Sequence, residues 1–426
     1  MIENNRILIV DDVEKDLNQL SDMFYRKGVG CRSFIYDGFT FPEAPLKGVR
    51  FAFFDINLKH ANQDSDIYAT LKEAITRYIS YDNGPFVLVF WSKNTDMIDG
   101  FSRFVNRTDD DFKNKIHPIL FEAIDKSLFI ENDNALEGAL DSILSKSIVN
   151  CLIRFDEEVL AAANQTLNSI IETIPQGNQW GNADEFNKNC QCVFSKIAEA
   201  TYGLTRAKTN PDSAIRESFI PVFASILLQN KKTYWNEFLK PLKTATKPSD
   251  LKFPNDYSRA TLNTIFHVNQ CLELFSKEDR GAICPLNETK KGDAFRTIFG
   301  TSYDDWFDGI MDNPTELVKN NSIIIGIEIS ASCDYSQNKS RTNKYILGVM
   351  LPISIKIKRC DYLLPIIDID YGGTTYKLVA NLNYSFIEPH NMPFLENPIL
   401  VLRKEIMDMI GNKYANHVSR IGITSF

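Results

Sequence analysis

The first 130 or so residues alternate short apolar runs with stretches of helical periodicity. Four runs, RILIV, GVRFAFFDI, GPFVLVFW and HPILFEAI, are apolar on both faces, which is typical of strands inside a parallel sheet. Between them, apolar positions recur with helical spacing over 14–27 and 66–80. Because strands that alternate with helices build doubly wound sheets, this pattern predicts an α/β domain with a parallel sheet over residues 1–133.

From residue 135 the pattern becomes helical. Apolar residues recur at spacings of three and four up to residue 174, and no proline or glycine follows Gly138 until Pro175. This predicts one long helix that continues the last helix of the first domain. It is expected to be either a signalling or dimerisation helix or the first helix of an intramolecular bundle. A helical domain is assigned to 134–315, with further helices over 184–203, 213–229 and 256–277 and polar loops such as CPLNETKKGD.

Residues 316–426 change character again. The runs SIIIGIEIS, KYILGVMLP, YLLPIIDID and TYKLVANLNYSFI are rich in β-branched and aromatic residues, and short turns such as YGGTT separate them. This composition predicts a small, mostly antiparallel β-domain. An amphipathic stretch over 398–423 is expected to close the domain as a helix.

Composition narrows the class of protein. The chain is 44% hydrophobic and 24% charged with a net charge of -8, which is ordinary for a globular protein and argues against a nucleic-acid or membrane footprint along the whole chain. No run approaches the roughly 18 apolar residues that a membrane span needs. The eight cysteines follow no disulfide framework, so reduced thiols are expected. We therefore expect a cytoplasmic protein with no membrane partner.

Candidate chemistry lies at the ends of the predicted strands. Asp11 and Asp12 follow the run RILIV, and Asp55 lies at the end of RFAFFD. Ser92 follows VLVFW, and Lys126 lies just past ILFEAID. The carboxyl ends of parallel strands meet at one edge of the sheet, where ligands bind. An acid pair can hold a hard divalent cation, with Mg²⁺ expected, while a third carboxylate attacks phosphorus. The hydroxyl and the ammonium can bind phosphoryl oxygens.

This set of residues resembles the receiver domain of two-component response regulators over about the first 130 residues. The resemblance implies a five-stranded, flavodoxin-like sheet. It also implies a phosphoacceptor that takes a phosphoryl group from a partner histidine kinase, with no enzymatic activity beyond its own phosphorylation and dephosphorylation. An effector protein and a homodimer are further partners that it suggests.

The resemblance assigns a role to each matching residue. Asp11 and Asp12 match the acid pair that binds Mg²⁺, and Asp55 matches the phosphoacceptor. Asn57, two positions later, would lend its backbone carbonyl to the ion. Ser92 matches the Ser or Thr whose hydroxyl responds to phosphorylation in the family. Lys126 matches the lysine that binds the phosphoryl group.

The chain also departs from the family's pattern. Ser127 follows Lys126 where the family has proline, and Ala123 stands where an aromatic residue is usual, with Phe121 two positions earlier. Lys115 is an alternative source of the site's amine. Because the hydroxyl and the aromatic residue report phosphorylation in the family, a pseudo-receiver that keeps the fold for sensing or docking is the alternative.

A second class of function would place the chemistry in the C-terminal region. Two alternative sets of acidic residues suggest a metal-dependent nuclease. One set is Glu328 and Asp334 with Lys339, and the other is Asp368 and Asp370, which share one face of a strand. Solvated acids are the simpler interpretation, and a nucleic-acid partner is not expected.

The C-terminal stretch SASCDYSQNK, which contains Cys333, also resembles part of large receiver proteins found beside histidine kinases in bacterial anti-phage loci. That resemblance implies a defence signalling protein.

Overall fold

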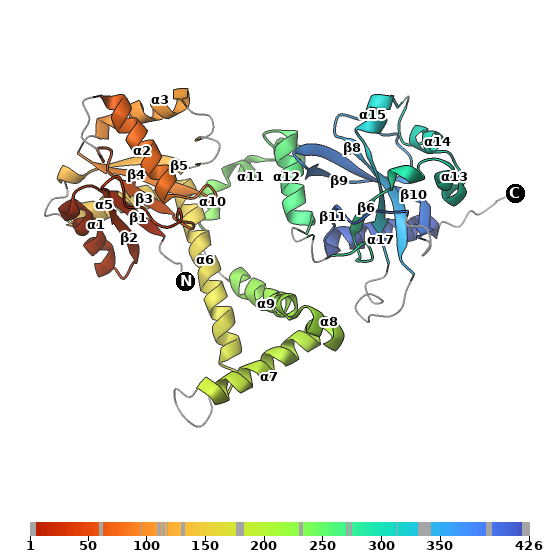
Figure 1. Ribbon diagram of the computed structural model, residues 1–426, viewed down its shortest axis with the longest axis horizontal. Coiled ribbons are helices and arrows are strands. Elements are labelled where there is room, and N and C mark those ends of the chain that lie inside the picture. Colours follow the sequence, from red (N-terminus) through yellow and green to blue (C-terminus); the bar gives the residue numbers. More distant parts are fainter. Residues whose placement is uncertain are drawn as a thin grey trace. The chain divides into compact units, whose positions relative to one another are not determined.

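The computed structural model (Figure 1) shows two compact units, Met1–Val193 with Arg216–Thr244, and Phe194–Ile215 with Ala245–Phe426. Each unit is described by itself below. The structure describes residues 6–58, 63–93, 95–108, 112, 116, 118–128, 133–175, 183–229, 233–269, 272, 275–312, 314–330, 342–388 and 394–419.

The first unit is built on a five-stranded sheet in the order β2-β1-β3-β4-β5. Every neighbouring pair of strands is parallel, which confirms the predicted parallel sheet. The order reverses at β1, between β2 on one side and β3 on the other. The strands are β1 (Ile7–Asp11), β2 (Cys31–Ile35), β3 (Phe51–Phe54), β4 (Phe86–Ser92) and β5 (Pro118–Asp125).

Helices cover both faces of this sheet (Figure 1). Successive side chains of a strand point to opposite faces, so Leu8 and Val10 lie in the core under α2 and α3, while Ile7 and Ile9 lie in the core under α1 and α5. The doubly wound arrangement is thereby confirmed. The helices are α1 (Glu14–Arg26), α2 (Asp64–Tyr78), α3 (Ile98–Thr108) and α5 (Asp133–Ser145).

Strand β2 has no counterpart among the predicted runs. Its sequence, CRSFI, contains two polar residues, and only Cys31 is fully buried. Among the described strands it pairs with β1 alone, at one edge of the sheet. An edge position of this kind does not require the continuous apolar run by which the other four strands were recognised.

The expected single helix from 135 is interrupted, which corrects that prediction. Lys146 is extended, with φ −63° and ψ 128°, and separates α5 from α6 (Ser147–Ile171). No proline or glycine causes the break. Leu136 and Ile143 of α5 share one core with Val149 of α6, so tertiary packing overrides a continuous local pattern.

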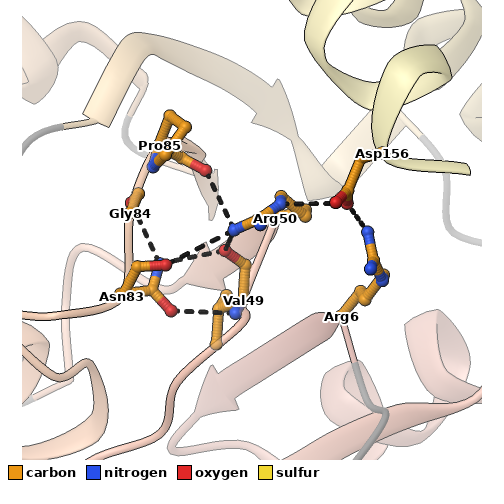
Figure 2. A network of polar contacts seen from close by, with 7 residues as sticks. All are labelled: Arg6, Val49, Arg50, Asn83, Gly84, Pro85 and Asp156. Atoms are coloured by element: carbon orange, nitrogen blue, oxygen red, sulfur yellow. Dashed lines mark hydrogen bonds and ion pairs between the residues drawn. The ribbon is translucent and has the colours of Figure 1, made fainter. Parts of the chain in front are cut away.

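A polar network fixes α6 to the amino ends of two strands (Figure 2). The carboxylate of Asp156 on α6 pairs with the guanidinium groups of Arg6, which precedes β1, and Arg50, which precedes β3. Arg50 Nη1 also donates to the main-chain carbonyls of Val49 and Asn83, at 3.3 and 3.4 Å. The helix is therefore attached through charged groups at the sheet edge where β1 and β3 begin.

Further helices follow α6 close to their predicted positions. The expectations of 184–203 and 213–229 correspond to α7 (Ala183–Tyr202) and α9 (Pro211–Leu228). The predicted helix over 256–277 begins at Asp256 but ends at His267, as α12 (Asp256–His267). Several short helices were not predicted, among them α8 (Leu204–Thr209), α10 (Trp235–Phe238) and α11 (Lys240–Thr244).

The second unit contains a six-stranded sheet in the order β11-β6-β7-β8-β10-β9. All its pairs are antiparallel, so the predicted antiparallel β-structure is confirmed. The strands are β6 (Ala282–Pro285), β7 (Ile323–Glu328), β8 (Lys344–Pro352), β9 (Leu363–Tyr371), β10 (Thr374–Ile387) and β11 (Leu400–Val401).

The helix α17 (Lys404–Val418) closes one face of this sheet as expected, with Met407 and Ile410 in the core. The stretch predicted for it, 398–423, began too early, because Leu400–Val401 form β11. The other face is covered by α13 (Asp293–Phe299) and α14 (Tyr303–Asp308), and α15 (Glu316–Asn320) precedes β7. The loop predicted at CPLNETKKGD is wrong at its start, because Cys284 and Pro285 belong to β6 and pair with β7.

Candidate functional site at the carboxyl edge of the parallel sheet

Four strands of the first unit deliver a polar side chain to one edge. Asp11 ends β1, Asp55 follows β3, Ser92 ends β4 and Lys126 follows β5. Only 0% of Asp11, 5% of Asp55, 1% of Ser92 and 4% of Lys126 is exposed. Polar and charged groups are rarely buried to this degree unless they have partners, because their desolvation is costly. The edge is thus a buried polar site rather than a set of solvated strand ends.

Three carboxylates gather there. Asp11, Asp12 and Asp55 each place a carboxylate oxygen within 4.8 Å of the others. In the part of the chain that the structure describes, this is the one group of three or more side chains able to share a metal ion. Asp12 is the more accessible member, because it is only half-buried.

The ammonium of Lys126 connects the cluster. Its Nζ lies 2.6 Å from Asp55 Oδ2 and 3.0 Å from Asp11 Oδ2. Asp16, on the first turn of α1, is not a member of the group of three but also contacts this nitrogen: its Oδ2 lies 2.9 Å from Lys126 Nζ. Lys126 therefore reaches the site, whereas the alternative, Lys115, lies outside the described residues.

Sequence reasoning missed Asp16. Its only signal is an acidic residue in the first turn of a helix, and such residues are common there because they interact favourably with the helix dipole. No pattern in the sequence separates Asp16 from Glu14 in the same turn. The structure distinguishes them, because Asp16 is half-buried against Lys126 while Glu14 is exposed.

The other oxygens of the two buried carboxylates accept main-chain hydrogen bonds. Val13 N–H donates to Asp11 Oδ1 at 2.9 Å, and Asn57 N–H donates to Asp55 Oδ1 at 3.1 Å. Each carboxylate is thus held through Oδ1 by the loop that follows its strand and through Oδ2 by Lys126. For Asn57 the structure places the N–H group, and a role for its carbonyl in binding metal stays a prediction.

The balance of charge in the cluster is negative. Burial raises the pKa of the Asp11 carboxyl to about 6, although the nearby Lys126 ammonium opposes the rise. Burial alone would lower the pKa of Lys126, but the carboxylates of Asp55 and Asp11 outweigh it, so this pKa is raised. Among the described residues, the Lys126 ammonium faces the carboxylates of Asp11, Asp55 and Asp16, with Asp12 close by. A further cation would offset the remaining charge.

The residues present fit a hard divalent cation. All three side chains of the group offer oxygen, which Mg²⁺ and Ca²⁺ prefer. Ligand oxygens that share one such ion at about 2.0–2.6 Å lie at most about 4–5 Å apart, and the observed limit of 4.8 Å meets this condition. The group can therefore bind a metal ion, and its geometry leaves the identity of the ion open.

The C-terminal acids show no comparable grouping among the described residues. Asp368 Oδ2 pairs with Arg259 of α12 at 2.7 Å, so it serves the packing of α12 on β9. Glu328 is fully buried at the end of β7, where its Oε2 accepts a hydrogen bond from Ser330 N–H. Asp370 is half-buried on β9, where its main-chain N–H donates to Thr264 Oγ1 at 2.9 Å. The remaining candidates of that region, Asp334, Lys339 and Cys333, lie outside the described residues.

Comparisons of the chain with protein-family models, curated proteins and solved structures give no match. Among the described helices, none combines the length and the apolar character that crossing a bilayer requires.

Proposed function

We propose that this protein is a phosphoacceptor of the response-regulator kind, with Asp55 as the residue that takes a phosphoryl group from a partner histidine kinase. The observation that carries the proposal is the contact of one buried ammonium, that of Lys126, with the carboxylates of Asp11 and Asp55 at the carboxyl edge of a parallel sheet. The strand order 2-1-3-4-5 supports it, because this is the flavodoxin-like order that receiver domains share.

In this proposal, Asp55 is the nucleophile. One of its carboxylate oxygens bonds to phosphorus while the bond between phosphorus and the kinase's histidine nitrogen breaks. The electron pair of that bond stays on the imidazole nitrogen, which regains a proton from water. Attack is aided because Asn57 N–H and Lys126 Nζ hold the carboxylate in one orientation before the donor arrives.

The other residues of the edge bind charge. Asp11 and Asp12 would hold Mg²⁺ together with Asp55, and the Asn57 carbonyl would be the fourth protein ligand. Bound Mg²⁺ would neutralise negative charge on the transferred phosphoryl group. Lys126 and the hydroxyl of Ser92, at the end of the strand next to β3, bind the phosphoryl oxygens.

Phosphorylation changes the contacts of Lys126, and this is how the signal leaves the site. A phosphoryl group on Asp55 replaces one carboxylate charge with nearly two and adds three oxygens that can accept hydrogen bonds. Lys126 then exchanges a carboxylate partner for a phosphoryl oxygen. This rearrangement at the carboxyl edge of the sheet alters the contacts of the protein with an effector protein or with a second copy of the chain.

Intact-mass spectrometry after treatment with acetyl phosphate and Mg²⁺ tests the proposal. We expect one phosphate on the wild type, none on Asp55→Asn and less on Asp11→Asn. Asp37→Asn is the matched control, because Asp37 is an exposed aspartate just beyond β2 and is expected to leave the wild-type result unchanged.

Two outcomes would contradict the proposal. A phosphate that persists on Asp55→Asn would place the acceptor elsewhere. If the wild type takes up no phosphate from acetyl phosphate or from any histidine kinase encoded beside it, the protein is a pseudo-receiver.

A further inference from the structure

Among the described residues, Asp16 is the one partner of Lys126 that stands outside the group of three candidate metal ligands. Its Oδ2 lies 2.9 Å from Lys126 Nζ, and its side chain is 14% exposed. The group whose oxygens can share an ion contains Asp11, Asp12 and Asp55. Asp16 comes from a different element, the first turn of α1, and not from a strand end.

The proposed reaction places conflicting demands on Lys126. Its two other partners, Asp11 and Asp55, are also the carboxylates that would bind the divalent ion. An ion at those oxygens weakens their hold on the ammonium, because two cations that share an acceptor repel each other. Phosphorylation then occupies an oxygen of Asp55 as well. The contact with Asp16 is the one that neither event removes.

We propose that Asp16 is a positioning residue that keeps Lys126 beside Asp55 while the metal ion and the phosphoryl group occupy the other carboxylates. This inference rests on the proposed function and adds a residue that the resemblance to receiver domains does not assign. Without Asp16, an ammonium repelled by the ion can swing away from the site, because a lysine side chain has four rotatable bonds. The phosphoryl oxygens then lose their contact with the Lys126 ammonium.

The experiment separates positioning from metal binding in the full-length protein. The rate of phosphorylation by acetyl phosphate is measured at saturating Mg²⁺, and the Mg²⁺ dissociation constant is measured by calorimetry without phosphodonor. The variants are Asp16→Asn, which keeps the shape, and Asp16→Glu, which keeps the charge. Glu14→Gln is the matched control, because it removes an exposed carboxylate from the same helical turn.

We expect Asp16→Asn to lower the phosphorylation rate about tenfold, which corresponds to one misplaced charged contact in the transition state. Its Mg²⁺ dissociation constant should stay within about threefold of the wild-type value, since Asp16 is not a ligand of the ion. Asp16→Glu should recover part of the rate, and Glu14→Gln should match the wild type in both measurements.

Other results overturn the inference. An unchanged rate in Asp16→Asn shows that Lys126 needs no such support, and a dissociation constant weakened about tenfold or more shows that Asp16 is a metal ligand. Circular dichroism checks that each variant is folded, and Asp16→Ser replaces Asp16→Asn if the latter is not. A wild type that takes up no phosphate contradicts the proposed function itself, which distinguishes that failure from the failure of Asp16 alone.

Discussion

The two ends of strands β1 and β3 carry opposite arrangements of charge. Where the strands begin, Arg6 and Arg50 share the carboxylate of Asp156 (Figure 2). Where they end, Asp11 and Asp55 share the ammonium of Lys126. At each end, two like charges beside these strands thus share one opposite charge, and at the carboxyl end Asp16 adds a third carboxylate.

The ends differ in how fully their charges are satisfied. At the amino end the three side chains are 21–30% exposed, so water screens them, and Arg50 also donates to main-chain carbonyls. At the carboxyl end the side chains of Asp11, Asp55 and Lys126 are at most 7% exposed, and further carboxylates join them. Buried charge without full compensation costs stability. The amino end is therefore suited to holding structure together, and the carboxyl end to binding a cation.

Removing the shared charge at the carboxyl end should give the largest effect. Lys126→Met leaves the buried carboxylates without their ammonium, and breaking a buried ion pair in this way typically costs about 3–5 kcal/mol. We expect a loss of this size in the free energy of unfolding of the first unit, read from native-state hydrogen exchange of β1 and β3 in EDTA. Millimolar Mg²⁺ should restore part of it, because the ion supplies the missing positive charge.

Lys47→Met is the control for that variant. Lys47 pairs with Asp82 at 3.1 Å, but the two side chains are 60% and 78% exposed, and such surface pairs contribute about 0–1 kcal/mol. If Lys126→Met and Lys47→Met destabilise the unit equally, the carboxyl end is not the charged, buried cluster described above.

The dependence of stability on pH should give the next largest effect. Burial raises the pKa of Asp11 to about 6 in the folded protein, against about 3.9 in the unfolded chain. The folded state binds this proton more tightly, so its stability falls as the pH rises from about 4 to about 6, by up to about 3 kcal/mol without metal. The measurement is urea unfolding in EDTA across this range, with the wild-type curve compared with that of Asp11→Asn.

The difference between these two curves isolates Asp11 from the other carboxyl groups of the chain. It should shrink when Mg²⁺ is present, since a bound ion would stabilise the ionised carboxylate in the folded state. Parallel curves for the wild type and Asp11→Asn would show that burial does not hold the proton on this residue.

The carboxyl end could be predicted from the sequence because its parts follow local rules. Buried strands are recognisable as apolar runs, and parallel strands must end at one edge. Hence Asp11, Asp55 and Lys126 could be placed together although 115 residues separate the first from the last. Asp16 could not be added, since an acid in a first helical turn has a sufficient local explanation.

Features that depend on distant partners could not be predicted. The contact of Arg6 with Asp156 joins residues with no common pattern, and nothing in the sequence around Lys146 marks the break between α5 and α6. Strand β6 is four residues long and is defined by pairing with β7, as in Cys284 opposite Gly326. In each case tertiary packing decides the structure, and local propensity is a weak guide to it.

The smallest effect is expected at the amino end. Asp156→Asn keeps the volume of the side chain and one hydrogen-bond acceptor but removes the charge that Arg6 and Arg50 share. Because these side chains are partly exposed, we expect a loss of about 1–2 kcal/mol, seen as faster hydrogen exchange in α6. Glu172→Gln, an exposed change just after α6, is the control and should leave the exchange unchanged.

The Mg²⁺ affinity of Asp156→Asn is the sharpest test of the contrast between the two ends. If each end works independently, the dissociation constant stays within about threefold of the wild-type value, because β1 and β3 transmit no rearrangement when their amino ends lose a partner. A larger change would mean that the charges at the two ends are coupled through these strands. The attachment of α6 would then be an output of the acidic site rather than a fixed support, and α6 would be the element through which occupancy of that site reaches the rest of the chain.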